Sequence, residues 1–238
     1  MRYKFILFLV VLFSVVFSCQ EETPLTFNAV NVTTNNTDIV EINIIEATGN
    51  ETVSNNINSQ ITKTVVSALH IGDPDSKTET SIEESVSNFN NAFEAFKADF
   101  PETPQVWEAQ IDGEVMYQSP NVISIAMTSY TNTGGAHGIV VVSFLNFDAK
   151  TGNLIENDAL INDLSAFKEL AKTYFNQEIE GKRDLYFEPE NFTLPANIGF
   201  NDDGLILLYN SYEIAPYSTG LTEFTIPYQT IDDYLNFK

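Results

Sequence analysis

Apolar residues recur with two different periods along this chain, and the change of period separates expected helices from expected strands. A spacing of three to four predicts helices over 53–69, 81–100 and 164–179. In the second of these, Ser81 is a suitable N-cap and the apolar positions from Ile82 to Phe100 form one stripe. Such an aromatic stripe is typical of a helix face that packs in a core.

The rest of the chain reads mainly as strands. Alternating or continuous apolar runs predict strands over 38–47, 105–111, 114–118, 121–130, 137–148, 192–198, 204–209 and 221–226, followed by a short helix over 228–237. We expect turns at Asp112-Gly113 and Ser119-Pro120. Hairpin-linked strands with a few segregated helices indicate an α+β fold with antiparallel sheets. We place two subdomains at 37–104 and 105–238.

The N-terminus has the pattern of a bacterial lipoprotein signal. Arg2 and Lys4 precede an apolar run that ends at Ser18-Cys19, and Cys19 is the only cysteine. We predict a signal peptide over 1–18, lipidation of Cys19 and a flexible tether over 19–36. Lipid chains hold such a protein on the membrane, so we expect it in the cell envelope, facing the periplasm or the cell surface. By class-level analogy, the acidic residues after Cys19 favour the outer membrane.

The net charge of the chain limits the classes of molecule that it can bind. The 238 residues carry 11 basic and 33 acidic side chains, a net charge of −22. Nucleic acid needs a basic face, so it is excluded as a partner. A cationic partner would be steered towards such a surface, although an acidic surface can also serve solubility alone.

Residues suited to catalysis are few. The chain has two histidines, His70 and His137, and no zinc-type spacing of histidine and cysteine. It also has no GxSxG motif, and catalytic carboxylates cannot be singled out among 33 acids. We therefore expect no metal, no cofactor and no enzymatic activity.

Two segments between strands have unusual compositions. The first runs from Tyr130 to Gly138 and contains Gly134, Gly135 and His137. It predicts either a glycine-permitted hairpin or a concave site in which backbone N–H groups bind an anion. The second, 209–220, holds Tyr212, Glu213 and Tyr217 around a proline. Tyrosines suit interfaces, while a rigid loop that packs on its own fold is the alternative.

These segments also carry a family resemblance. TSYTNTGGAHG, FLNFDAKTGNLI, NFTLPANIGFNDDGLILLYNSYEIAPYSTG and TIPY follow one another in that order. The series resembles the extracytoplasmic domain shared by RsiV-type anti-sigma factors and the accessory region of PdaC-type peptidoglycan deacetylases. The resemblance covers about residues 105–236, and residues 37–100 resemble more weakly the small domain that precedes it.

The resemblance implies a two-part α+β fold associated with peptidoglycan biology. In the RsiV branch the domain binds lysozyme, a strongly basic protein. We expect the chain to lack the sigma-binding and deacetylase segments of the two namesakes and to act as a lipid-anchored binding module. Its ligand is expected to be a lysozyme-like cationic protein or a peptidoglycan fragment. We expect the ligand to contact Tyr130, Gly134, Gly135, His137, Tyr212, Glu213 and Tyr217. A peptidoglycan-acting enzyme that uses His137, or a structural envelope lipoprotein, is the alternative.

Overall fold

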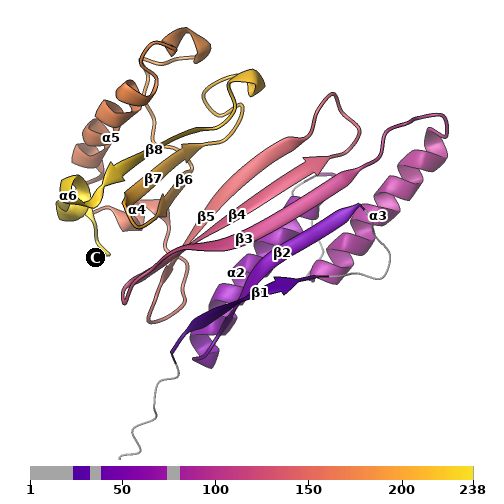
Figure 1. Cartoon of the computed structure of the whole chain (residues 1–238), viewed down its shortest axis with the longest axis horizontal. Helices are drawn as coiled ribbons and strands as arrows, with labels where there is room; N and C mark the ends of the chain where they lie inside the picture. Colours follow the sequence, from indigo (N-terminus) through magenta and orange to yellow (C-terminus); the bar gives the residue numbers. More distant parts are fainter. Residues whose placement is uncertain (1–23, 33–38, 74–80, 238) are drawn as a thin grey trace, which may run out of the picture.

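Two β-sheets with separate helices make up the described part of the chain. The computed structural model describes residues 24–32, 39–73 and 81–237. The first sheet has five strands in the order β1-β2-β3-β4-β5, at Thr26–Asn31, Val40–Thr48, Glu108–Gln118, Val122–Asn132 and Ile139–Asp148. The second has the order β6-β7-β8, at Asn197–Phe200, Gly204–Tyr209 and Thr222–Pro227. Antiparallel pairing dominates both, which confirms the predicted α+β class (Figure 1).

Helices α2 (Glu51–Leu69) and α3 (Ile82–Asp99) cover one face of the first sheet (Figure 1). They connect β2 to β3, the one parallel strand pair among the described residues, because parallel neighbours cannot be joined by a hairpin. Ile57 and Phe89 are fully buried in a core that includes Ile111 and Ile125 of the sheet.

Helix α3 follows its sequence pattern closely. The Ser81 hydroxyl accepts a hydrogen bond from the Glu84 backbone N–H at 3.1 Å, as an N-cap does. Phe89 and Phe93 of the stripe are buried beside Trp107. The last member, Phe100, is the C-cap residue just beyond the helix and is 58% exposed, whereas Phe96 still packs against the core.

The pattern misplaced one turn. Asp112-Gly113 does not break the chain, because β3 runs unbroken through it and pairs with β4 from Glu108 to Gln118. Asp112 accepts a hydrogen bond from the Asn43 side chain at 3.2 Å, which uses its polar group on the sheet. The register shift that an interrupted strand would show lies further on, between Val115 and Tyr117.

Part of the predicted flexible tether is a strand. Cys19 and the signal peptide 1–18 lie outside the described residues, but Thr26–Asn31 form β1 and pair antiparallel with β2. Leu25, Phe27 and Val30 pack against the first core. The Thr- and Asn-rich composition that suggested a linker is therefore that of an edge strand in which Phe27 and Val30 are half-buried.

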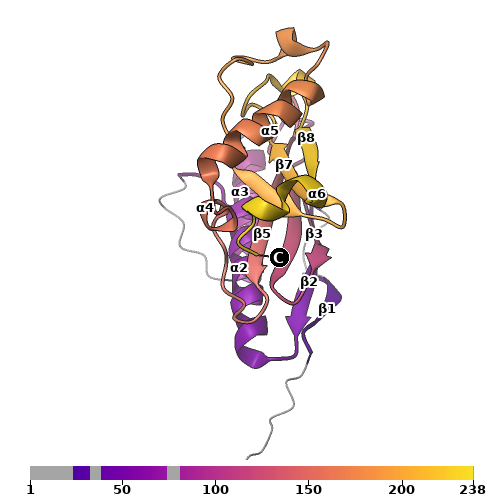
Figure 2. The ribbon, with the colours of Figure 1, turned by 90° about the vertical axis from the view of Figure 1, so that its left-hand side faces the viewer.

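The second sheet packs against α5 (Leu164–Glu178), on the side that points away from the first unit (Figure 2). Phe167, Ala171 and Phe175 of this helix are buried with Leu205 and Ile226. Short helices α4 (Asn157–Leu160) and α6 (Tyr228–Ile231) and the 3₁₀ turns η2 (Arg183–Leu185), η3 (Tyr217–Thr219) and η4 (Asp232–Tyr234) complete the unit. The strand expected over 192–198 is present only as β6, which begins at Asn197. The helix expected over 228–237 is present as the short helix α6 followed by the turn η4.

Buried polar side chains join the two sheets. The Ser124 hydroxyl accepts from the Phe200 N–H at 3.0 Å, and the Asn146 amide donates to the Ile198 carbonyl at 2.7 Å. A Cβ atom on Gly199 would lie 2.5 Å from the Phe144 ring, so glycine permits the close approach of β6 to β5.

The division between the two units differs from the one expected at residues 104 and 105. One core joins residues 40–147 and the other joins mainly residues 155–235. The expected boundary therefore falls between α3 and β3, within the first unit. The change from a helical to a strand pattern after α3 suggested a new domain. It marks instead the point where the crossover connection from β2 returns to the same sheet as β3.

Candidate functional site

Two loops that are distant in sequence meet at one edge of the molecule. Residues 133–138 connect β4 to β5, and residues 210–221 connect β7 to β8. Both point to the upper edge in Figure 1. The sequence predicted that both segments contribute to one binding surface. In the structure, side-chain contacts bring His137, Tyr212 and Tyr217 of these segments together.

These three residues, which we call the aromatic cluster, make defined contacts. The rings of His137 and Tyr217 are stacked, with centroids 3.6 Å apart and planes 13° apart. The Tyr212 ring lies 5.9 Å from that of Tyr217, and its hydroxyl is 3.5 Å from Nε2 of His137. Nδ1 of His137 lies 3.0 Å from the Gly138 carbonyl oxygen, so both ring nitrogens have polar neighbours.

Tyr212 has an unusual backbone. Its φ of +71° is the one positive value at a non-glycine residue in the described chain. The turn is closed by a hydrogen bond from the Tyr212 N–H to the Ala215 carbonyl at 3.1 Å. The side chain is nevertheless 53% exposed, so this strained geometry presents an aromatic ring to solvent.

Tyr130 lies beside the cluster and explains one glycine. A Cβ atom at Gly138 would collide with the Tyr130 ring and hydroxyl, so the ring packs directly on the Gly138 backbone. Tyr130 is half-buried on β4. It therefore supports the base of the loop that carries His137.

Gly134 and Gly135 belong to the same hairpin as His137. Gly134 has φ +88°, and its N–H donates to the Asn132 side chain at 3.1 Å. A Cβ atom there would lie 3.0 Å from the Gln105 side-chain oxygen. This arrangement fits the hairpin interpretation of the glycines, since the Gly134 N–H is already used within the turn.

Glu213 braces the second loop. Its two carboxylate oxygens accept hydrogen bonds from the Ala196 N–H at 3.0 Å and the Asn210 N–H at 2.9 Å. Asn210 in turn binds the open edge of β5 through its side chain, donating to the Val142 carbonyl and accepting from its N–H, each at 2.9 Å. Thus the loop that carries Tyr212 and Tyr217 is fixed to both sheets.

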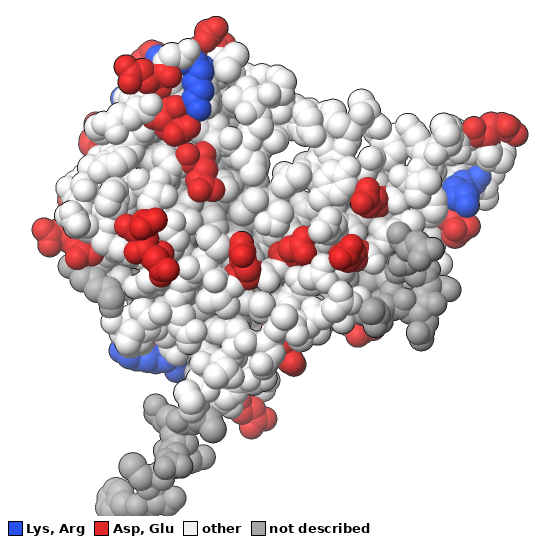
Figure 3. All heavy atoms as spheres, in the orientation of Figure 1, with Lys and Arg blue, Asp and Glu red and all other residues white. Residues whose placement is uncertain are grey.

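Acidic side chains outnumber basic ones in the chain, but they do not gather at these loops, where the face in Figure 3 is mostly uncharged. Figure 3 shows carboxylates spread over the face seen in Figure 1, with basic side chains only towards its margins. Among the described residues, no group of three or more His, Cys, Asp and Glu side chains is placed to hold a metal ion. Within the same ranges, no helix is both long and apolar enough to cross a membrane.

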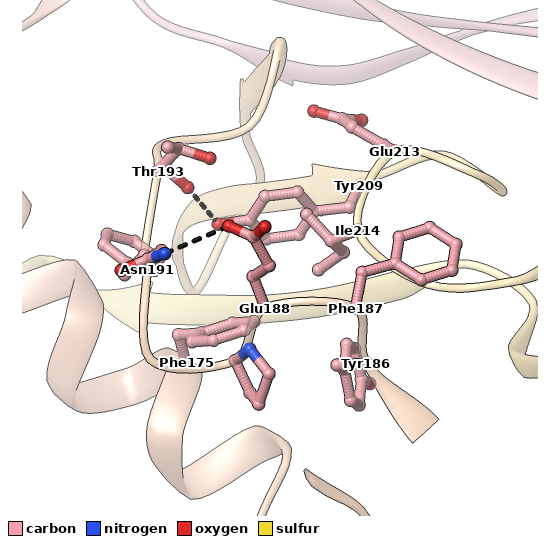
Figure 4. A pocket seen from close by; sticks show the side chains of 11 residues that line it. Phe175, Tyr186, Phe187, Glu188, Asn191, Thr193, Tyr209, Glu213 and Ile214 are labelled. Atoms are coloured by element: carbon pink, nitrogen blue, oxygen red, sulfur yellow. Dashed lines mark hydrogen bonds between the residues drawn. The ribbon is translucent and has the colours of Figure 1, made fainter. Parts of the chain in front are cut away.

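A cavity of about 370 Å³ lies in the second unit and was not predicted from the sequence. Its apolar wall comprises Phe175, Tyr186, Phe187, Phe192, Tyr209 and Ile214 (Figure 4). The Tyr209 hydroxyl donates to the Thr193 carbonyl at 2.6 Å, and burial, helped by the charge of Glu213, raises its pKa. The signal that could have indicated this cavity is Phe187-Glu-Pro-Glu-Asn-Phe192, an aromatic and acidic segment around a proline.

Two family models match the chain. Deacetylase PdaC matches residues 32–140, and a protein family of unknown function, DUF3298, matches residues 153–229. The gap between them agrees with the division of the two cores. No deacetylase catalytic domain is among the matched regions. A comparison with curated protein sequences found no match.

Two crystal structures have a similar fold. A DUF3298 family member from Bacteroides fragilis has a TM-score of 0.65 at 18% identity, over 90% of this chain and 95% of that one. A DUF3298 family protein from Pseudomonas aeruginosa has a TM-score of 0.62 at 17% identity, over 90% and 96%. Residues 32–140 are thus similar to Deacetylase PdaC and residues 153–229 to DUF3298, matches that suggest an extracytoplasmic cell-envelope domain.

Proposed function

We propose that this chain is a non-catalytic, lipid-anchored receptor that binds a lysozyme-like cationic protein through the aromatic cluster. The observation that carries the proposal is the stack of His137 on Tyr217 with the strained, exposed ring of Tyr212 beside it. Backbone strain at an exposed side chain is a feature of ligand-contacting sites. Stacked rings also lose little conformational freedom when a ligand binds, which favours affinity.

The charge supports a protein ligand of the opposite sign. Cleavage before Cys19 would remove Arg2 and Lys4 but no carboxylate, leaving nine basic against 33 acidic residues. Such a surface accelerates encounter with a basic protein and suppresses acidic partners. The exposed ring of Tyr212 would then supply the close contact with the bound protein, because aromatic anchors carry much of the energy of protein interfaces.

The position of β1 constrains how the domain would stand on the membrane. If Cys19 carries the lipid, only seven residue steps separate it from Thr26, the first residue of β1. Seven extended residues span at most about 25 Å. The receptor would therefore be held close to the membrane surface.

A second ligand class uses the same rings. A peptidoglycan fragment presents sugar faces that stack on aromatic side chains, and it does not require an acidic surface. Salt distinguishes the two, because the Debye length falls from about 10 Å at 0.1 M to about 3 Å at 1 M. Affinity for a cationic protein should fall steeply with salt, whereas affinity for a neutral glycan should not.

The test is a binding titration of the purified protein with a cationic lysozyme, beside a variant with Tyr212→Ala. We expect saturable one-to-one binding that the substitution weakens at least tenfold. A matched control is Tyr234→Ala, which removes a tyrosine from η4 in the second unit. Equal losses in the two variants would contradict the assignment of the surface.

A further inference from the structure

The cavity in the second unit is built from segments that are separate in sequence. Phe175 comes from α5, Tyr209 from β7, Ile214 from the loop after β7, and Tyr186 to Thr193 from the segment between η2 and β6. A hydrogen bond from the Phe187 N–H to the Ile214 carbonyl at 3.0 Å joins the two loops at its rim. The walls are therefore held in place by backbone contacts and by the core.

The lining combines aromatic rings with negative charge. Tyr186, Phe192 and Tyr209 are buried, while Phe187 is 58% exposed at the mouth. The polar members are Glu188, Asn191, Thr193 and Glu213, and no lysine or arginine lines the cavity. Figure 4 shows the Glu188 carboxylate joined by a dashed line to the Asn191 amide.

The two carboxylates differ in how they are used. Both oxygens of Glu213 already accept backbone N–H groups. Glu188 accepts a hydrogen bond through Oε2 from the Asn191 amide at 3.0 Å, which orients the carboxylate. No side chain or backbone N–H of the described residues donates to its other oxygen, so Glu188 is the group placed to act as a counter-ion.

Two basic side chains just before the 186–193 segment are paired with other groups. The Arg183 guanidinium contacts Glu190 at 2.7 Å and donates to the Pro189 carbonyl at 3.2 Å. Lys182 contacts Glu178 at 2.8 Å. These pairs compensate that positive charge, so the exposed carboxylates of Glu188 and Glu213 give the rim of the cavity a negative character.

We propose that this cavity binds an organic ammonium group carried on an apolar stem, with Glu188 as the counter-ion. Aromatic rings attract a desolvated cation through their faces, and the apolar wall accommodates the stem. Tyr209 contributes as a neutral phenol whose oxygen retains acceptor capacity, because its proton is donated to Thr193. The proposal concerns a different set of side chains from the aromatic cluster and does not rest on the proposed function.

An ammonium of this kind occurs in a free amine and in a lysine side chain of a protein. The probes are therefore n-butylamine and N-acetyl-lysine methylamide, and the neutral control is the same lysine derivative acetylated on its ε-nitrogen. Each is titrated into the full chain while backbone amide chemical shifts are followed by NMR. We expect saturable millimolar binding of at least one charged probe, with shifts at residues 186–193 and 214, and at least fivefold weaker binding of the neutral control.

Glu188→Gln tests the counter-ion without emptying the cavity, because glutamine retains an oxygen that accepts from Asn191. We expect it to weaken binding of the charged probe at least fivefold. Glu180→Gln is the matched control, since Glu180 is exposed and does not line the cavity. Binding of only the lysine probe would indicate a protein ligand, and similar binding of both would indicate a free amine. The proposal is overturned by equal binding of charged and neutral probes, by no saturable shift, or by equal effects of the two substitutions.

Discussion

The imidazole of His137 lies flat on the phenol ring of Tyr217, 3.6 Å between centroids, although 80 positions separate them in the chain. One ring comes from the hairpin of the first sheet and the other from a loop of the second. The stack therefore links the two units at the edge where we place the binding surface. The imidazole nitrogens of His137 contact the Gly138 carbonyl and the Tyr212 hydroxyl, so His137 is suited to position the two tyrosine rings.

Replacing His137 with alanine should separate binding from stability. The side chain is exposed, so the loss of one ring contact should lower the free energy of unfolding by no more than about 1 kcal/mol. Affinity for lysozyme should fall at least fivefold. His137→Phe, which retains a ring for the stack, should recover most of that affinity. Loss of a peptidoglycan-hydrolysing activity in His137→Ala, at unchanged stability, would instead favour the enzymatic alternative.

The positive φ of Tyr212 predicts that a glycine at this position gives a more stable protein than an alanine, the reverse of the usual order. Tyr212→Gly and Tyr212→Ala both remove the ring, but only glycine relieves the left-handed backbone strain, which costs roughly 1–2 kcal/mol. We expect the glycine variant to be more stable than the alanine variant by about 1 kcal/mol in urea unfolding. Both should bind lysozyme equally weakly. A more stable alanine variant would show that the loop relaxes without strain.

Asn210 acts in place of a strand at the open edge of β5. Its side chain makes two hydrogen bonds to Val142, each 2.9 Å long, and a typical hydrogen bond contributes about 1 kcal/mol net. Asn210→Ala should therefore lower the free energy of unfolding by about 2 kcal/mol. Asn210→Asp retains only the acceptor and brings a charge near Glu213, so we expect a loss at least as large at pH 7. A loss below about 0.5 kcal/mol for both variants would contradict this bridging role.

Tyr209 should make the protein sensitive to alkaline pH. Burial raises its pKa above the ordinary value of about 10, so above pH 10 the unfolded chain releases this proton while the folded protein retains it. Stability contributed by the neutral phenol is thus complete below pH 10 and is lost as the pH rises beyond it. Tyr209→Phe should cost about 1 kcal/mol at pH 7, through the lost hydrogen bond to Thr193.

Above pH 10 the Tyr209→Phe variant should lose stability less steeply than the unmodified protein, by up to about 1.4 kcal/mol per pH unit. Tyr228, whose pKa burial also raises, leaves a residual slope in both proteins. Unfolding by urea at pH 7, 10 and 11 measures these slopes. Identical slopes would mean that the Tyr209 phenol becomes accessible before the protein unfolds.

The local pattern predicted the elements better than their assembly. Ser81 marked the start of α3, and the long apolar run after His137 marked β5, because capping and periodicity are local properties. Asp112-Gly113 was misleading, since a glycine opposite Met127 fits within a paired strand as well as in a turn. The parallel pairing of β2 with β3 arises from a crossover connection that periodicity does not encode.

The candidate site was partly predictable for the same reason. Composition singled out the segments that carry His137 and Tyr217, but not their stacking, which depends on how the two sheets pack. Glu213 was expected to contact a ligand, yet its oxygens bind two backbone N–H groups. The cavity beside Glu188 escaped prediction because its walls come from three separate segments of the second unit, at residues 175, 186–193 and 209–214.

The most direct test of the receptor proposal is calorimetric titration of a soluble form with a cationic lysozyme, at low and high salt. This form should begin before Leu25, since β1 belongs to the first sheet. We predict one-to-one binding that is at least tenfold tighter at 0.05 M than at 0.5 M salt. The Tyr212→Ala substitution should weaken this binding at both salt concentrations. No heat of binding at either salt concentration would contradict the proposal, as would an affinity that salt and the substitution leave unchanged.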